Sequence, residues 1–232
     1  MNLLSKATSN AKSIKNLKFT EFDSYILYLA PAEEARPGRT LCPAASPGCK
    51  AACLYSAGRG QIKTVVSARI RKSLLYLDNP KQFLEFLHED IDRAIRKAKR
   101  SNRQVAIRLN GTSDIDWASH GIISHFQTVQ FYDYTKRPAL LTAGLPNYHV
   151  TLSASETNDN LCIRALSRGY NVAVVFSGTL PSEYKGYPVI SGDDHDLRFL
   201  DPRGAEGRGV VIGLTAKGLA RHDTSGFVRV GD

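Results

Sequence analysis

The chain has 232 residues, of which 42% are hydrophobic and 23% are charged, and its formal net charge is +9. These proportions are ordinary for a folded globular protein and exclude a disordered chain or a coiled coil. No apolar stretch approaches the roughly 20 residues of a membrane-spanning helix, and the start lacks the apolar segment of a secretory signal, so we expect a cytoplasmic protein with no membrane partner. The positive charge indicates either a polyanionic partner such as nucleic acid or solvated helix faces.

Strand and helix candidates alternate along the chain. A basic N-terminal segment, residues 1–20, precedes a short apolar and aromatic run at 25–29 that predicts a buried strand. Two helices are predicted over 64–77 and 80–100. In the second helix apolar residues recur every three or four positions, and Asn79 is the predicted N-cap.

From residue 104 onward the strand candidates arrive in series. Each is rich in β-branched or aromatic residues, and they are 104–110, 129–135, 148–155, 171–177, 187–192 and 209–216. Helix-length segments at 116–126 and 158–168 separate some of them. Repeated strand-then-helix units predict a parallel sheet covered by helices, either an open doubly wound sheet or a barrel. We expect residues 21–232 to form one α/β domain with a partial parallel (β/α) barrel.

Polar residues follow these strands at their carboxyl ends. They are Asn110, Thr112, Ser113 and Asp114, then Asp133, Tyr134, Thr135 and Lys136, then Ser153, Ser155 and Glu156, then Ser177, then Asp193, Asp194, His195 and Asp196, and finally Lys217. In parallel α/β proteins the ligand site lies at the carboxyl ends of the strands, so we expect these residues to converge on one pocket. Any single group, taken alone, also suits a helix cap or a turn.

Three of the four cysteines lie in the loop after the first predicted strand. Cys42, Cys49 and Cys53 have the spacing C-x6-C-x3-C, among Pro and Gly residues that let the loop turn back on itself. Disulfides are rare in a reducing cytosol, so metal binding or redox chemistry is favoured. Structural zinc usually takes four protein ligands, whereas three thiolates suit a [4Fe–4S] cluster with one open iron. Cys162 lies in a predicted helix, where a buried apolar cysteine is the commoner role.

A three-cysteine loop directly after the first strand of such a series resembles the radical S-adenosylmethionine (SAM) superfamily. The resemblance implies a partial barrel, a [4Fe–4S] cluster on the three cysteines, SAM bound at the open iron, and an external electron donor for its reductive cleavage. The common motif there is C-x3-C-x2-C, from which this loop departs. The stretch CPAASPGCKAAC is more similar to the loop of the radical-SAM-like phage gene product 37/68 family.

A longer match identifies the chain as a member of the bacteriophage gene product 88 family. The match covers roughly 42–228 and is carried by CLYSAGRG, RLNGTSDIDW, VQFYDYTK, YHVTLSASE, NVAVVFSG, SGDDHDLRFLDP and GLTAKG, together with the cysteine loop. Membership implies a shared fold and a viral or prophage origin, and hence the cytoplasm of an infected or lysogenic bacterial host.

The radical SAM resemblance also implies roles by position. The residues expected to meet the SAM amino group are Asn110, Gly111 and Thr112. Those expected to face its ribose or carboxylate are Ser153, Ser155 and Glu156. The later loops would hold the substrate, a nucleotide, nucleic acid or other host component, and would supply acid and base groups. The residues expected there are Asp133, Lys136, Asp193, His195 and Lys217.

Two other functions fit the same residues. The stretch SGDDHD is also typical of metal-dependent phosphoesterases, so a nuclease or replication-associated protein is the alternative enzyme. The third hypothesis is a non-enzymatic nucleic-acid-binding module, with zinc as a structural metal in the cysteine loop. Polar residues concentrated at successive strand ends favour a concave site over a flat binding surface.

Overall fold

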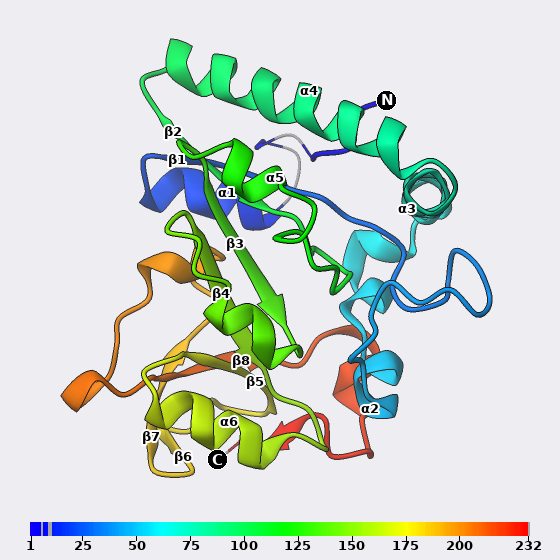
Figure 1. Ribbon diagram of the computed structural model, residues 1–232. Coiled ribbons are helices and arrows are strands. Elements are labelled where there is room, and N and C mark those ends of the chain that lie inside the picture. Colours follow the sequence, from blue (N-terminus) through cyan, green and yellow to red (C-terminus); the bar gives the residue numbers. More distant parts are fainter. Residues whose placement is uncertain (6, 9–10, 232) are drawn as a thin grey trace.

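The structure is a computed structural model and describes residues 1–5, 7–8 and 11–231. A curved sheet with helices on its outer face forms the centre of the protein (Figure 1). The helices are α1 (Ala11–Phe19), α2 (Pro47–Ala51), α3 (Lys63–Asp78), α4 (Pro80–Arg100), α5 (Ile122–His125) and α6 (Asp159–Ser167). The strands are β1 (Phe22–Ile26), β2 (Gln104–Arg108), β3 (Gln130–Thr135), β4 (Tyr148–Ser153), β5 (Val172–Ser177), β6 (Glu183–Tyr184), β7 (Tyr187–Ser191), β8 (Val211–Thr215) and β9 (Arg229–Val230).

The strands pair in the order β1-β2-β3-β4-β5-β8-β7-β6, and β9 also pairs with β5. The pairings between these strands are parallel, apart from the β6–β7 hairpin. Among the described residues β1 does not pair with β6 or β7, so the sheet is not closed. These findings confirm the predicted α/β class with a mostly parallel sheet, whereas the short strands β6 and β9 were not predicted.

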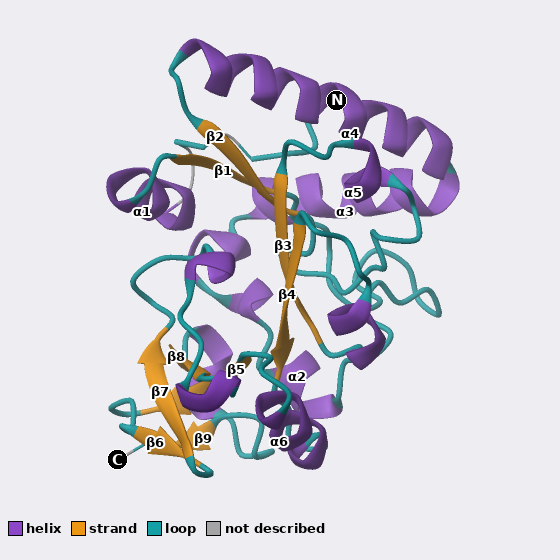
Figure 2. Cartoon of the chain, turned by 60° about the vertical axis from the view of Figure 1, so that its left-hand side comes forward, coloured by secondary structure: helices purple, strands orange, loops and turns teal. Residues whose placement is uncertain are grey.

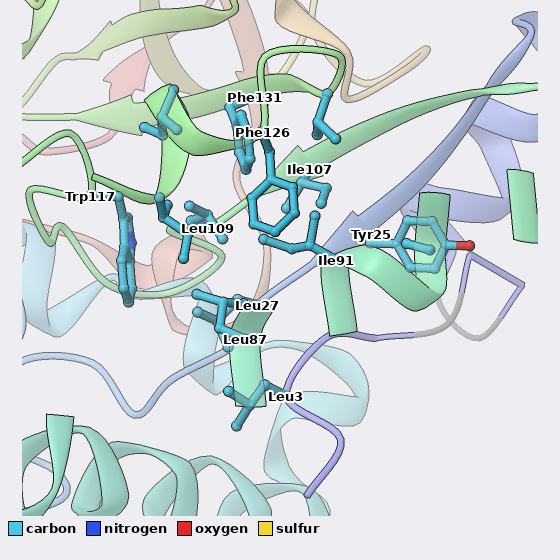
Figure 3. Packing of buried hydrophobic residues seen from close by; sticks show 14 of the residues in the cluster. Leu3, Tyr25, Leu27, Leu87, Ile91, Ile107, Leu109, Trp117, Phe126 and Phe131 are labelled. Atoms are coloured by element: carbon cyan, nitrogen blue, oxygen red, sulfur yellow. The ribbon is translucent and has the colours of Figure 1, made fainter. Parts of the chain in front are cut away.

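Two apolar clusters hold the helices against the outer face of the sheet. Near β1 to β3, strand residues such as Ile107 and Phe131 pack against Leu87 and Ile91 of α4 (Figure 3). Near β4 and β5, side chains such as Phe176 pack in a cluster that includes residues of α6. Each fully buried Leu, Ile or Phe contributes about 1.5–3 kcal/mol, so these clusters fix where the strand ends lie.

The long helices agree closely with the pattern of the sequence. α4 begins and ends where its apolar periodicity predicted, and Asn79 caps it by accepting a hydrogen bond from the Gln82 N–H at 3.1 Å. α3 and α6 lie within one residue of their predicted bounds at each end. No helix in the described part of the chain combines the length and the apolar character needed to cross a membrane.

The first strand lies earlier than predicted. β1 pairs with β2 along its whole length, from Phe22 opposite Gln104 to Ile26 opposite Arg108. Within the run 25–29 all residues but the partly buried Tyr28 are buried, and the strand register with β2 ends at Ile26, so burial more than strand pairing explains the apolar character of the run.

The predicted helix at 116–126 is wrong over its first half. Asp116 accepts a hydrogen bond from the Ser119 N–H at 3.1 Å, which makes a side-chain turn in place of a helical turn. Gly121 then adopts a left-handed φ of 71°, and only the four residues of α5 after it are helical. Short polar side chains therefore overrode the helical spacing of the apolar residues.

The described part of the N-terminal segment packs onto this framework. Leu3 is fully buried, and its N–H donates to Asp90 of α4 at 2.5 Å. Leu4 forms an antiparallel bridge with Leu27, just after β1. Asn16 of α1 donates to Ser24 of β1 at 2.9 Å, so α1 lies beside the edge strand of the sheet. Figure 2 shows α1 next to β1.

Candidate functional site

A cavity of about 330 Å³ lies at the carboxyl ends of the parallel strands. Its wall is built by the cysteine loop, by residues at or just after the ends of β2, β3, β4, β7 and β8, and by α1. This volume suits a cofactor or a ligand of nucleotide size. The predicted site residues that border it are Cys42, Cys49, Cys53, Asn110, Gly111, Thr112, Lys136, Ser153, Asp193, His195 and Lys217. Three others, Asp133, Ser155 and Glu156, lie outside the wall.

The cysteine loop reaches the cavity through the short helix α2. Ser46 caps this helix, because its Oγ accepts a hydrogen bond from the Cys49 N–H at 3.2 Å. Cys42 Sγ accepts a hydrogen bond from the Ala32 N–H at 3.2 Å. Burial raises the pKa of Cys42 to about 11 in spite of this bond, and burial also raises the pKa of Cys53. Without a metal these two thiols are therefore protonated at neutral pH, and metal binding would release their protons.

The chemistry of this donor set fits an iron–sulfur cluster. Three thiols from one loop border one cavity, and Fe–S clusters are held by such cysteine thiolates. Within the described residues no three His, Cys, Asp or Glu side chains are gathered closely enough to hold a single metal ion. Cys162 stands apart from this set. It is buried in α6 and donates to Asn158 Oδ1 at 3.3 Å, which confirms its predicted place in a packed helix.

A partly buried arginine, Arg69, lies close to the cysteine loop. The Arg69 guanidinium lies over the rings of Tyr28 and Tyr55, at 4.9 and 5.3 Å from their centroids. Its Nε and Nη1 are buried and have no hydrogen-bond partner among the described residues. Arg69 interacts favourably with a thiolate at Cys53, so it brings positive charge to the side of the cavity where a cluster would sit.

The loop after β2 is organised by Asn110. Its Oδ1 accepts hydrogen bonds from Ser113 Oγ, the Ile115 N–H and Trp117 Nε1, at 2.9, 2.9 and 3.1 Å. Asn110 borders the cavity, but its side-chain oxygen is already occupied, so the side chain shapes the wall. Trp117 is fully buried. Gly111 passes so close to the chain after β1 that a Cβ there would lie 2.6 Å from the Leu27 carbonyl oxygen.

Asp133 on β3 lies beneath the wall of the cavity. It is fully buried and accepts hydrogen bonds from the Asn110 N–H at 2.6 Å and from the Tyr148 hydroxyl at 3.2 Å. Burial raises its pKa to about 7, even though these hydrogen bonds act in the opposite direction. Its neighbour Lys136 does reach the cavity, where its ammonium lies 5.4 Å from the centre of the Phe227 ring.

The residues after β4 divide between the cavity and the structure that supports it. Ser153 borders the cavity. Ser155 is buried, and its N–H donates to Asn158 Oδ1 at 2.7 Å at the start of α6. Glu156 points to the cysteine loop and accepts from Ser46 Oγ at 2.7 Å and from the Gly48 N–H at 2.8 Å. Ser155 and Glu156 therefore hold loops in place around the cavity.

His195 lies at the part of the wall that follows β7. Its Nδ1 is 3.2 Å from Arg198 Nη2, and its Nε2 is 3.7 Å from Asp201 Oδ1. Burial, together with the charge of Arg198, lowers the pKa of His195 below its ordinary value. The imidazole is therefore neutral at physiological pH.

Three cationic residues of the wall were not predicted as site residues. They are Lys12 and Lys15 of α1 and Arg108 at the end of β2. The i, i+3 spacing of the two lysines places them on one face of a helix, but only the fold brings that face to the strand ends. An arginine within an otherwise apolar strand was the available signal for Arg108, since a buried charge requires a partner.

The fold and the site define an α/β protein with a cysteine-lined cavity at the carboxyl ends of its parallel strands. A family model, gene product 88, matches residues 2–231, and the chain belongs to this family. This confirms the membership that the sequence motifs indicated. Comparisons with curated proteins and with solved structures gave no match.

Proposed function

We propose that the protein is a radical-SAM-like enzyme that holds a [4Fe–4S] cluster on Cys42, Cys49 and Cys53. The observation that carries this proposal is that all three cysteines border the same cavity as the strand-end polar residues. Three protein ligands leave one iron open for a substrate or cofactor. When bound and reduced by an external donor, the cluster would supply one electron for the reductive cleavage of SAM.

The curvature of the sheet supports the hypothesis that the fold is a partial barrel. The parallel strands turn progressively from β1 to β8 (Figure 2), and the helices α4, α5 and α6 pack on the outer clusters. The opening between β1 and β6, the two ends of the strand order, would then be the gap of an incomplete barrel. In such an arrangement the strand ends surround a reactive species and limit the access of water to it.

The residues of the chain have distinct proposed tasks. Thr112 and Ser153 would contact SAM, because they border the cavity and carry hydroxyl groups. Lys136, His195 and Lys217 would hold the substrate. His195, whose pKa is lowered by burial and by the Arg198 guanidinium, would act in its neutral form as the proton acceptor.

The metal-dependent nuclease has less support from the same cavity. Two of its three candidate carboxylates are already engaged, because Asp196 contacts Lys12 and Arg108, and Asp193 contacts Lys217, whereas Asp194 is exposed. Two-metal phosphoesterase sites need carboxylates free to bridge or flank the ions. These ion pairs would therefore have to break before the carboxylates could bind the metal ions of a nuclease.

Anaerobic purification with iron, sulfide and zinc analysis tests the proposal. We expect about four irons and four sulfides per chain, with visible absorption of the cluster. Cys49→Ala should abolish both. Cys162→Ala is the matched control and should retain them, since Cys162 lies outside the cavity wall. One zinc per chain and no iron would overturn the proposal and turn the loop into a structural clip.

A further inference from the structure

The cavity wall formed by α1 and the ends of β2, β7 and β8 carries excess positive charge. We call this part the cationic wall, and its charged members are Lys12, Lys15, Arg108, Lys217, Asp193 and Asp196. Four cations face two carboxylates, which leaves an excess of two positive charges. Elsewhere in the cavity Lys136 and Asp114 offset each other, so the excess belongs to this wall.

At the base of the cationic wall, the Asp196 carboxylate forms ion pairs with two cations. Asp196 accepts from Lys12 Nζ at 2.8 Å, and both of its oxygens lie 3.2 Å from Arg108 Nη1. Arg108 and Asp196 are only 6% and 4% exposed. The group therefore holds one uncompensated positive charge beside buried surface, which is unfavourable unless an anion comes near.

A second uncompensated charge lies nearer the rim. The Asp193 carboxylate is engaged by Lys217 Nζ and by the Thr215 N–H. Lys15 donates to the backbone carbonyl of Asp193 at 2.6 Å, so no carboxylate of the described residues neutralises it within an ion pair. Lys15 is an exposed side chain that borders the cavity, and its ammonium is available to a ligand entering there.

We propose that the cationic wall binds the phosphate monoester of a small substrate of nucleotide size. A phosphate monoester carries close to two negative charges at neutral pH, which matches the excess charge, whereas a carboxylate would leave one cation unpaired. Lysine and arginine are the usual partners of phosphate. Arg108 is recessed, and nucleic-acid backbones are bound by projecting side chains, so the wall suits a small phosphorylated molecule that enters the cavity.

The inference rests on the proposed function only in treating this cavity as the active site, because phosphate binding requires no cluster. The test is equilibrium dialysis of the full chain against adenosine 5′-monophosphate, adenosine, inorganic phosphate and a single-stranded oligonucleotide. We expect the monophosphate to bind and adenosine to bind at least about tenfold more weakly, since one charge-assisted contact accounts for such a factor. Inorganic phosphate should compete with the monophosphate.

Two variants assign the binding to the cationic wall. Lys12→Met leaves the Arg108–Asp196 pair as a neutral unit, and Lys15→Gln removes a rim cation, so neither disturbs the packing of the sheet. Each should weaken monophosphate binding about tenfold. Lys97→Gln, an exposed lysine on α4, is the control and should change nothing.

Three outcomes would overturn the inference. These are equal binding of adenosine and its monophosphate, unchanged binding by Lys12→Met and Lys15→Gln, or binding of the oligonucleotide alone. Iron and sulfide are measured on the same samples. Phosphate binding without a cluster would refute the proposed function and keep this inference, whereas a cluster without phosphate binding would do the reverse.

Discussion

Glu156 Oε2 accepts a hydrogen bond from Ser46 Oγ at 2.7 Å, and this bond joins the loop after β4 to the loop that carries the cysteines. The same carboxylate accepts the Gly48 N–H, and Ser46 Oγ accepts the Cys49 N–H. A Cβ at position 48 would lie 2.8 Å from the Glu156 carboxylate, so glycine permits the approach. Glu156 therefore positions the segment that presents Cys49 to the cavity.

Removal of this carboxylate should loosen the cysteine loop. We expect Glu156→Ala to lower the free energy of unfolding by about 1–3 kcal/mol, because Ser46 and Gly48 lose their acceptor. Iron content after anaerobic reconstitution should fall as well. Glu85→Ala, an exposed position on α4, is the matched control. A variant with full iron content and unchanged urea unfolding would show that the loop holds its shape without Glu156.

Asn110→Ala should destabilise the protein before it affects any ligand. The substitution leaves the Ile115 N–H and Trp117 Nε1 buried without an acceptor, which costs about 1–3 kcal/mol for each such group. Urea unfolding followed by the fluorescence of Trp117, the sole tryptophan, measures the loss. If stability is unchanged and only SAM binding is weakened, Asn110 contacts the cofactor and the structural role is wrong.

Asp133 should make stability fall as pH rises. Burial raises its pKa from 3.8 to about 7, so the folded state binds a proton that the unfolded state releases between these values. The contribution is complete below about pH 3.8 and is lost as pH approaches 7. Relative to Asp133→Asn, the wild type should lose of the order of 2 kcal/mol between about pH 5 and about pH 8. Parallel stability profiles of the two proteins would contradict this.

The comparison with Asp133→Asn is needed because other groups titrate nearby. Burial, with the charges of Arg198 and Arg203, lowers the pKa of His149 to about 4. Its contribution has the opposite sign, since it is present above the unfolded pKa near 6.5 and is lost as pH falls toward 4. The difference between wild type and variant removes this background.

Arg69 should raise the reduction potential of the cluster. A reduced cluster is more negative, and a nearby cation with no carboxylate partner favours that state. Arg69→Met keeps the volume between Tyr28 and Tyr55 and should lower the potential by tens of millivolts, where about 59 mV is a tenfold change for one electron. Arg71→Met, exposed on the same helix, is the control. Equal potentials in a redox titration would refute this role.

Local signals in the sequence were sufficient for the regular elements. α4 was predicted to the residue because its apolar period, its cap and its length all agree. The parallel strands from β2 to β5 were predicted from their β-branched runs and turn residues. β9 has only two residues and forms through its pairing with β5, so no local sequence pattern predicts it.

The residues of the site could be predicted from the sequence only where they come directly after a parallel strand. The cysteine loop and the residues after β2, β7 and β8 reached the expected cavity because parallel strands end at one edge. Lys12 was missed because its partner Asp196 lies far along the chain, and only the fold brings them together. Asp133 and Glu156 were expected to contact the substrate or SAM, but the carboxylate of each accepts a hydrogen bond from a neighbouring loop.

The most direct measurement is the electron paramagnetic resonance spectrum of the anaerobically reduced protein, before and after addition of SAM. An open iron that binds SAM predicts a [4Fe–4S] signal whose shape changes on addition of SAM and is absent in Cys49→Ala. A cluster signal that SAM leaves unchanged, in a protein with full iron content, would contradict the claim that this cavity joins a cluster to SAM.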